Sequence, residues 1–253
     1  MQLRIRSITY LAEAINGYEF VDPRGRDLPR FAAGAHIDMR LGGLLRQYSL
    51  CNDPAERQRY CIAVLREDAS RGGSRYLHDT VRVGDLVEVS LPRNNFPLDA
   101  TAKRHLLIAG GIGIAPMISM IAELRRRRVD FRLHYCTRSV ARTAFHDDLA
   151  SLAAEGRVRF HHDSGDPTLG LDIAAALRDR PPGTHLYYCG PANMMAAGRS
   201  GERMAGGHHA LRILHGAAGR AGRRGPAVPR QARETRRRIP SRGRRDDRQR
   251  APQ

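Results

Sequence analysis

The chain has 253 residues, of which 41% are hydrophobic, enough to bury one large core or two smaller ones. Its formal net charge of +17 is unevenly distributed, because the segment from Arg199 to the C-terminus contains 16 Arg and only 4 acidic residues. Residues 1–198 carry a net charge of only +5, so the overall charge says little about the function of that part. No apolar run approaches the length of a membrane span, which excludes an integral helical membrane protein from our expectations.

Cysteine usage and the N-terminal sequence indicate a reducing compartment. The four cysteines stand singly, without the paired spacing of a zinc site or a disulfide framework. The first residues, MQLRIRSITYLAEA, lack the charged start, apolar core and cleavage site of a secretory signal. We therefore expect a cytoplasmic protein that holds no metal and does not enter a membrane.

Residues 1–100 are predicted to form a small antiparallel β-barrel. Short runs of alternating or β-rich residues, separated by Gly, Pro, Asn and Asp, occur at residues 33–41, 46–51, 59–67 and 85–91. The stretch PRNNFPLDATAK, residues 92–103, has two prolines and no periodicity, which is typical of a linker. One strand is unusual, because RQYSLCN places a guanidinium, a phenol, a hydroxyl and a thiol close together.

Residues 101–197 show a different pattern, in which strands alternate with helices. The expected strands are residues 105–110, 131–137, 158–163 and 184–190, and the expected helices are residues 115–128, 143–155 and 171–179. This alternation predicts right-handed crossovers and a parallel sheet, with a ligand site at the carboxyl ends of its strands. The predicted fold class is therefore a β-barrel followed by an α/β domain and, over residues 198–253, a disordered basic tail.

A glycine-rich turn joins the first strand of the expected α/β domain to its helix. In LLIAGGIGIAPM, the residues Gly110, Gly111 and Gly113 permit close approach of backbone N–H groups to an anion. Pro116 suits the first turn of the helix. The spacing differs from the usual dinucleotide fingerprint, so the motif alone is equally compatible with a plain tight turn.

Three further motifs also have plain explanations when each is taken alone. RGGSR, residues 71–75, can form an N–H nest for a phosphate or a solvated loop. In YYCGP, Cys189 precedes a sharp turn, but a lone cysteine is most often a small buried apolar residue. Neighbours such as His161 and His162 point to opposite faces of a strand, which argues against a shared metal ion there.

The order of these motifs along the chain resembles the ferredoxin–NADP reductase superfamily. RxYS on a barrel strand is followed by RGGS, then by GGIGIAPM at the opening of the α/β domain, and finally by YCTRS and CGP. Residues 1–197 are most similar to the phthalate dioxygenase reductase type, which includes the oxidoreductase component of vanillate demethylase. The resemblance implies a flavin-binding barrel over residues 1–100 and a nucleotide-binding α/β domain over residues 101–197.

The resemblance also implies roles for individual residues. In such reductases hydride passes from the nicotinamide of NADH to N5 of the flavin, and electrons leave singly. The residues implied to lie at this transfer, and so to be catalytic, are Ser49 and Cys189. The residues implied to bind the flavin are Arg46, Tyr48, Ser49, Arg71, Gly72, Gly73 and Ser74. Those implied to bind the nicotinamide nucleotide are Gly110, Gly111, Gly113, Thr137, Arg138, Cys189, Gly190 and Pro191.

The implied cofactor is FMN, because no adenine-binding extension is visible, and the implied electron donor is NADH. Arg138 and Arg142 could nevertheless accommodate the 2′-phosphate of NADPH. The implied partner is the terminal oxygenase of a two-component aromatic-ring dioxygenase or O-demethylase. Two alternatives stay open: an FAD-containing ferredoxin reductase with a separate acceptor, and a nucleic-acid-binding protein that acts through its basic tail.

The tail departs from the family pattern. Reductases of this type continue into a [2Fe–2S] ferredoxin domain with C-x₄-C-x₂-C…C ligand spacing, but no cysteine follows Cys189 here. Residues 198–253 are rich in Arg, Gly, Ala and Pro without helix or strand periodicity, so we expect them to be disordered. The abrupt change after NMMAA favours a shifted reading frame over an evolved basic tail. DNA sequence without an alternative frame carrying four spaced cysteines would contradict this interpretation.

Overall fold

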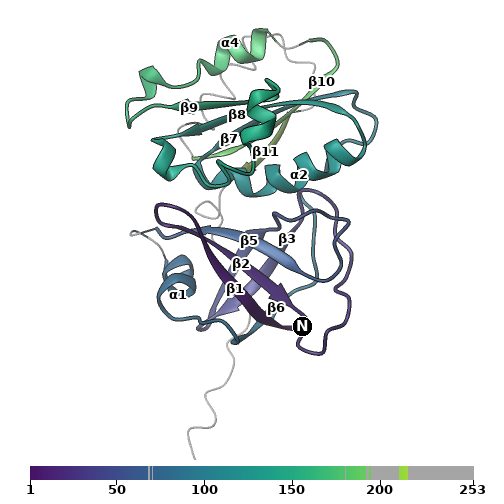
Figure 1. The fold of residues 1–253 in the computed structure, drawn as a ribbon, viewed down its shortest axis with the longest axis vertical. Coiled ribbons are helices and arrows are strands. Elements are labelled where there is room, and N and C mark those ends of the chain that lie inside the picture. Colours follow the sequence, from purple (N-terminus) through teal and green to yellow (C-terminus); the bar gives the residue numbers. More distant parts are fainter. Residues whose placement is uncertain (68, 70, 180, 192–193, 195–210, 216–253) are drawn as a thin grey trace, which may run out of the picture. The chain divides into compact units, whose positions relative to one another are not determined.

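The computed structural model describes residues 1–67, 69, 71–179, 181–191, 194 and 211–215. Within these residues the chain forms a six-stranded antiparallel sheet, followed by a five-stranded parallel sheet with helices on its faces (Figure 1). The predicted sheet types and their order along the chain are confirmed.

The antiparallel sheet closes into a barrel. Its elements are β1 (Gln2–Ala12), β2 (Ile15–Val21), β3 (His36–Leu41), β4 (Leu44–Ser49), β5 (Tyr60–Leu65), α1 (Gly73–Asp79) and β6 (Leu86–Val89). The strand order is β4-β3-β6-β1-β2-β5, and the two edge strands meet at a bridge between Leu50 and Ile62. Register shifts in β1 after Ile5 and after Tyr10 bend this long strand and help the sheet to curve.

The parallel sheet lies between two layers of helices. Its elements are β7 (Arg104–Gly110), η1 (Gly111–Gly113), α2 (Ile114–Arg126), β8 (Asp130–Thr137), η2 (Val140–Arg142), α3 (Ala150–Ala154), β9 (Val158–His162), η3 (Pro167–Leu169), α4 (Ile173–Arg178), β10 (Thr184–Gly190) and β11 (Leu211–His215). The strand order is β11-β10-β7-β8-β9. Side chains from β7 alternate between two cores, since Leu107 packs with residues of α2 and Ile108 packs with Leu177 of α4.

Helix α2 follows from its apolar spacing. Ile114, Met117, Ile121 and Leu124 recur every three or four residues and are all buried against the sheet. The run of arginines that follows has no apolar face to bury, and Arg128 at φ 55° turns the chain toward β8. Among the described residues, no helix is both long and apolar enough to cross a lipid bilayer.

The predicted absence of strands beyond Arg199 is wrong for Leu211–His215, which form β11. This strand pairs in parallel with β10, from Leu186 opposite Leu211 to Gly190 opposite His215. The backbone of this strand satisfies the backbone groups that β10 would otherwise leave open at the sheet edge. The parallel sheet therefore extends past residue 197, where the α/β domain was predicted to end. The rest of the predicted tail lies outside the described residues.

Two local predictions also need correction. The helix expected over residues 143–155 is reduced to α3, because Phe145 has φ 61° and residues 145–149 form turns instead. RGGSR was expected to be a loop, yet helix α1 begins at Gly73. Gly72 has φ 94°, a left-handed conformation that glycine adopts easily, and this lets the chain turn directly into the helix.

Residues 92–103 form no helix or strand, as a linker was expected to, but they are firmly packed. The Phe96 ring is 1% exposed and meets Tyr187 of β10 edge-on, with ring centres 5.5 Å apart. The Asp99 amide donates a hydrogen bond to the Tyr187 hydroxyl at 2.7 Å. This segment therefore attaches to the parallel sheet rather than connecting the two folds loosely.

Candidate functional site

The carboxyl ends of three parallel strands lie at one edge of the sheet. In the register, Gly110 at the end of β7 pairs with Cys136 of β8, and Ala109 pairs with Cys189 of β10. The turn after β7, the loop after β8 and the turn after β10 therefore lie together, as parallel-sheet topology requires. These are the three places where the nucleotide-binding residues were predicted.

The turn after β7 packs so closely on the end of β10 that two of its positions have no room for a side chain. A Cβ atom at Gly113 would lie 2.2 Å from the carbonyl oxygen of Cys189. A Cβ atom at Gly110 would lie 2.5 Å from the sulfur of Met194 and 2.8 Å from Cδ of Pro191. At Gly111, with φ 52°, a Cβ atom would meet nothing within 4 Å. Gly110 and Gly113 thus let the two backbone segments touch, whereas Gly111 faces open space.

Cys189 is a buried thiol. Its side chain is 4% exposed, and burial raises its pKa to about 12, so the sulfur stays protonated at neutral pH. A thiolate nucleophile is therefore excluded at this position. Any role for Cys189 beside a nicotinamide would be that of a neutral, polarisable contact.

Thr137 and Arg138 follow β8 but behave differently. Thr137 is 7% exposed, and its hydroxyl lies 2.7 Å from Oγ1 of Thr143 and 2.9 Å from Nδ1 of His162. This hydroxyl therefore fixes the base of the loop over residues 138–142. Arg138 is exposed on that loop, and its guanidinium makes no ion pair with any described residue. Of the two predicted ribose-side residues, only Arg138 is presented to solvent.

We expect Thr137→Val to destabilise the protein by about 1–2 kcal/mol, because the buried Thr143 hydroxyl and the half-buried His162 ring each lose a hydrogen bond. Urea unfolding followed by circular dichroism measures this change. Thr9→Val, on an exposed strand position, is the matched control and should change the free energy of unfolding by less than about 0.5 kcal/mol. Equal effects of the two substitutions would contradict the assigned role of Thr137.

The two adjacent histidines of β9 point to opposite faces of the sheet, as the sequence predicted. His162 bonds Thr137, whereas Nε2 of His161 lies 2.9 Å from Nδ1 of His134. Within the described ranges, no group of three or more His, Cys, Asp or Glu side chains is arranged to hold a metal ion. The sequence contains a second pair of adjacent histidines, His208 and His209, which lies outside the described residues.

We expect stability to fall as pH decreases from about 6.5 to about 4, partly through His161. Burial, then His134 and then Arg159, lower the pKa of His161 to about 4, whereas an unfolded histidine titrates near 6.5. The unfolded chain therefore binds the proton first, and the native state loses stability over that pH range. His161→Gln should reduce this loss by about 1 kcal/mol, a figure that allows for the partial exposure of the side chain.

Urea titrations at pH 7.5 and 5.0 check this expectation. His146→Gln, which removes a more exposed histidine, is the control. A pH dependence in His161→Gln equal to that of the unsubstituted chain would contradict it.

The predicted flavin residues of β4 lie next to those at residues 71–74, where the chain enters α1. Nη2 of Arg46 donates a hydrogen bond to the carbonyl oxygen of Arg71 at 2.6 Å. A Cβ atom at Gly73 would lie 2.5 Å from Cγ of Arg46, so this glycine makes room for the arginine. The hydroxyl of Ser74 accepts a hydrogen bond from the Glu67 amide at 3.3 Å. A guanidinium thus lies against the small residues where the chain enters α1, an arrangement suited to an anionic group.

Tyr48 and Ser49 lie at the end of β4, next to the edge where β4 meets β5. Tyr48 packs against the barrel core, and burial raises the pKa of its phenol far above the ordinary value, so it stays neutral. Ser49 is opposite His36 of β3 in the register. Neither hydroxyl forms a hydrogen bond with any described residue, although both side chains are half-buried. The hydroxyls of Tyr48 and Ser49 are therefore suited to hydrogen-bond a ring with polar edges, such as that of a flavin.

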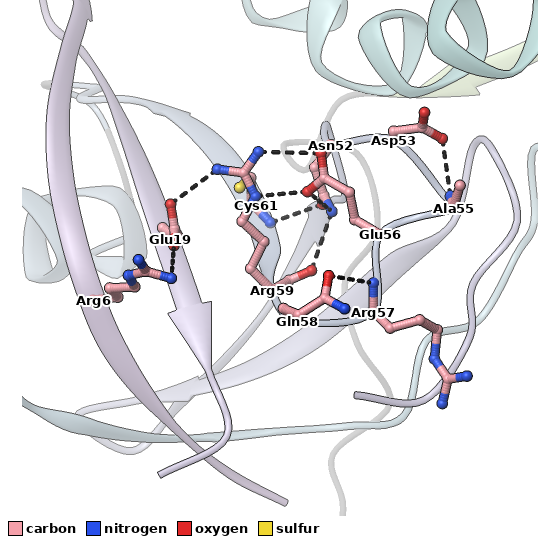
Figure 2. A network of polar contacts seen from close by, with 10 residues as sticks. All are labelled: Arg6, Glu19, Asn52, Asp53, Ala55, Glu56, Arg57, Gln58, Arg59 and Cys61. Carbon is pink, nitrogen blue, oxygen red and sulfur yellow. Dashed lines mark hydrogen bonds and ion pairs between the residues drawn. The ribbon is translucent and has the colours of Figure 1, made fainter. Parts of the chain in front are cut away.

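The loop after β4 is held by a polar network that sequence reasoning did not find (Figure 2). Asn52 accepts a hydrogen bond from the Cys61 amide at 2.9 Å and donates one to the Arg59 carbonyl oxygen at 3.1 Å. The Arg59 guanidinium binds Glu56 at 2.6 Å and Glu19 at 3.1 Å. The network fixes the chain where it leaves β4, and so supports the position of Ser49. Most of these residues lie close together between Asn52 and Cys61, whereas Glu19 comes from β2, so only the fold reveals that they form one network.

Comparisons with known proteins identify relatives of this chain. Residues 107–200 match the family described as oxidoreductase NAD-binding domain. The reductase subunit of tert-butanol monooxygenase / tert-amyl alcohol desaturase from Aquincola tertiaricarbonis is 54% identical over 198 residues, 78% of this chain and 59% of that protein. Vanillate O-demethylase oxidoreductase from a Pseudomonas strain is 47% identical over 77% of this chain and 62% of its own length.

A solved structure, phthalate dioxygenase reductase, superposes with a TM-score of 0.79 at 43% identity. The match covers 85% of this chain and 67% of that one, which is described as a modular structure for electron transfer from pyridine nucleotides to [2Fe–2S]. The chain spans about 60% of the length of the curated relatives it matches.

Proposed function

Because the chain belongs to the ferredoxin–NADP reductase superfamily, in its phthalate dioxygenase reductase branch, we propose that it is a flavin-dependent NAD(P)H oxidoreductase. It would act as the reductase component of a two-component oxygenase or demethylase. The proposal rests on the presence of two closely packed sites in one chain. One lies around Arg46 and Gly73 in the barrel, and the other lies around Gly113 and Cys189 in the parallel sheet. Each depends on a glycine that has no room for a Cβ atom.

In the proposed mechanism the barrel residues bind and orient the flavin. Arg46 and the backbone N–H groups of Gly72–Ser74 would hold its phosphate through charge-assisted hydrogen bonds. Tyr48 would pack on the ring, and the Ser49 hydroxyl would donate a hydrogen bond to its polar edge. When bound, a flavin accepts hydride and releases electrons one at a time.

The residues at the edge of the parallel sheet would bind the nicotinamide nucleotide. The turn Gly110–Gly113 would face the pyrophosphate, Arg138 would lie near the adenosine ribose, and Cys189–Pro191 would border the nicotinamide. None of these groups is placed to act as an acid or base, and the buried Cys189 thiol remains protonated. The protein's contribution is therefore distance, stacking and the exclusion of water.

We further propose that the flavin is FMN and that the donor is NADH. The printed sequence has four cysteines, none after Cys189, so it does not contain the C-x₄-C-x₂-C…C ligand spacing. NADH oxidation with artificial acceptors such as ferricyanide is then expected. Turnover of an oxygenase should be poorly coupled, and efficient coupled turnover after addition of a separate ferredoxin would contradict this expectation.

An anaerobic absorbance titration tests the proposed function. Purified protein reconstituted with FMN should show flavin bands that bleach when NADH is added, without iron–sulfur absorbance. Chromatography of the flavin released by denaturation separates the FMN proposal from the FAD alternative. Protein that binds neither FMN nor FAD, or bound flavin that NADH does not reduce, would contradict the proposal.

A further inference from the structure

The hairpin between β1 and β2 contacts the loop that follows β8. The Glu13 amide donates a hydrogen bond to the carbonyl oxygen of Ala141 at 2.8 Å. The Glu13 carboxylate also binds the Arg142 guanidinium in bidentate fashion, with oxygen atoms 3.1 Å from Nε and 2.8 Å from Nη2. Two parallel hydrogen bonds give such a pair directional strength that a single charge contact lacks.

The loop that carries Arg142 is closed at its base, so the backbone that positions this arginine is held in place. The Thr143 hydroxyl donates to the Ser139 carbonyl oxygen at 2.8 Å and lies 2.7 Å from the Thr137 hydroxyl. Ser164, after β9, donates its amide to the Arg138 carbonyl oxygen at 3.0 Å. Residues 138–142 are therefore held from the sheet side and from the hairpin side.

This loop occupies the place where related topologies distinguish NAD from NADP. In parallel α/β sheets with a glycine turn after the first strand, the adenosine ribose lies at the end of the adjacent strand, and a nearby arginine accommodates a 2′-phosphate. Here β7 carries the glycine turn and β8 is the adjacent strand. The loop offers two guanidinium groups, and only that of Arg142 has an acidic partner among the described residues.

We propose that Glu13 is a specificity-determining residue that favours NADH over NADPH. By neutralising Arg142, Glu13 withholds one of the two guanidinium groups that a 2′-phosphate would otherwise recruit. The Arg142 guanidinium in turn lowers the pKa of Glu13, so the carboxylate remains charged at neutral pH. The inference rests on the proposed nucleotide site at the end of β8, and it adds a residue from the barrel to that site.

Binding of two nucleotide fragments tests the proposal without any flavin chemistry. Isothermal titration calorimetry would compare adenosine 2′,5′-bisphosphate with 5′-AMP, which lacks the 2′-phosphate. Glu13→Gln should bind the bisphosphate about five- to tenfold more tightly while its affinity for 5′-AMP stays unchanged, because one guanidinium is released to the added phosphate. The ratio of kcat/KM for NADPH to that for NADH, with ferricyanide as acceptor, should rise by a similar factor.

Two further variants decide the interpretation. The double variant Glu13→Gln/Arg142→Gln should lose the gain in bisphosphate affinity, because the released guanidinium is then absent. Glu88→Gln removes the same charge from an acid that pairs with Arg40 on the barrel, and should leave both affinities as they are. A gain that persists in the double variant, or that Glu88→Gln reproduces, would overturn the role of Glu13.

Unchanged bisphosphate affinity in Glu13→Gln, with 5′-AMP still bound, would overturn this inference alone. Failure of the unsubstituted chain to bind 5′-AMP and to oxidise NADH would overturn the proposed function, and the inference with it.

Discussion

Gly113→Ala should destabilise the protein by about 3 kcal/mol and abolish NADH-dependent flavin reduction. The added Cβ atom would lie 2.2 Å from the carbonyl oxygen and 2.6 Å from the carbonyl carbon of Cys189, and 3.0 Å from the Gly190 amide nitrogen. These are backbone atoms of a central strand, so they cannot rotate away as a side chain would. The turn after β7 and the end of β10 must then separate. Because both segments form the proposed nucleotide site, that site would be lost.

Gly111→Ala is the matched control within the same turn. Its Cβ atom would meet nothing within 4 Å, so the cost should be only about 1 kcal/mol, from placing alanine at a positive φ. Urea unfolding measures both variants, and stopped-flow reduction of bound flavin measures the function. If Gly113→Ala were no less stable than Gly111→Ala, the contact between the turn and β10 would not have the importance assigned to it.

Arg46→Gln should weaken flavin binding about 10- to 100-fold, because a charge-assisted hydrogen bond to a phosphate contributes about 1.5–3 kcal/mol. Arg46 lies against Gly73 and bonds the Arg71 carbonyl oxygen, so the side chain is already placed at the loop. Arg46→Lys should give an intermediate affinity, since lysine keeps the charge but cannot bind in bidentate fashion. Quenching of FMN fluorescence during titration gives each dissociation constant.

Arg40→Gln removes the same charge from the neighbouring strand β3, where Arg40 pairs with Glu88 at 3.1 Å. Flavin affinity in this control should stay within about twofold of the unsubstituted chain, because an exposed pair of this kind contributes little. Equal losses in Arg40→Gln and Arg46→Gln would mean that the general positive charge of the barrel binds flavin. FMN affinity unchanged in Arg46→Gln would contradict the assignment of Arg46 itself.

The periodicity of apolar residues was sufficient to predict the strands and helices of the parallel sheet, but it predicted the ends of the elements less well. The run LLIAG and the apolar spacing of α2 depend on local residue order, so the sequence indicated both. It did not indicate α1, because RGGSR contains two glycines that disfavour a helix. The positive φ of Gly72 and the packing of Leu77 in the barrel core outweigh that preference.

The order of motifs along the chain, from RxYS through RGGS and GGIGIAPM to CGP, determined the family and the two sets of candidate residues by itself. What only the tertiary structure decided is which of them meet. The closure of the barrel places Arg46 against Gly73, and the parallel register places Gly113 against Cys189. The Asn52 network and the Glu13–Arg142 pair join residues from different strands and domains. Contacts of this kind depend on strand register and chain crossing, which local residue patterns do not encode.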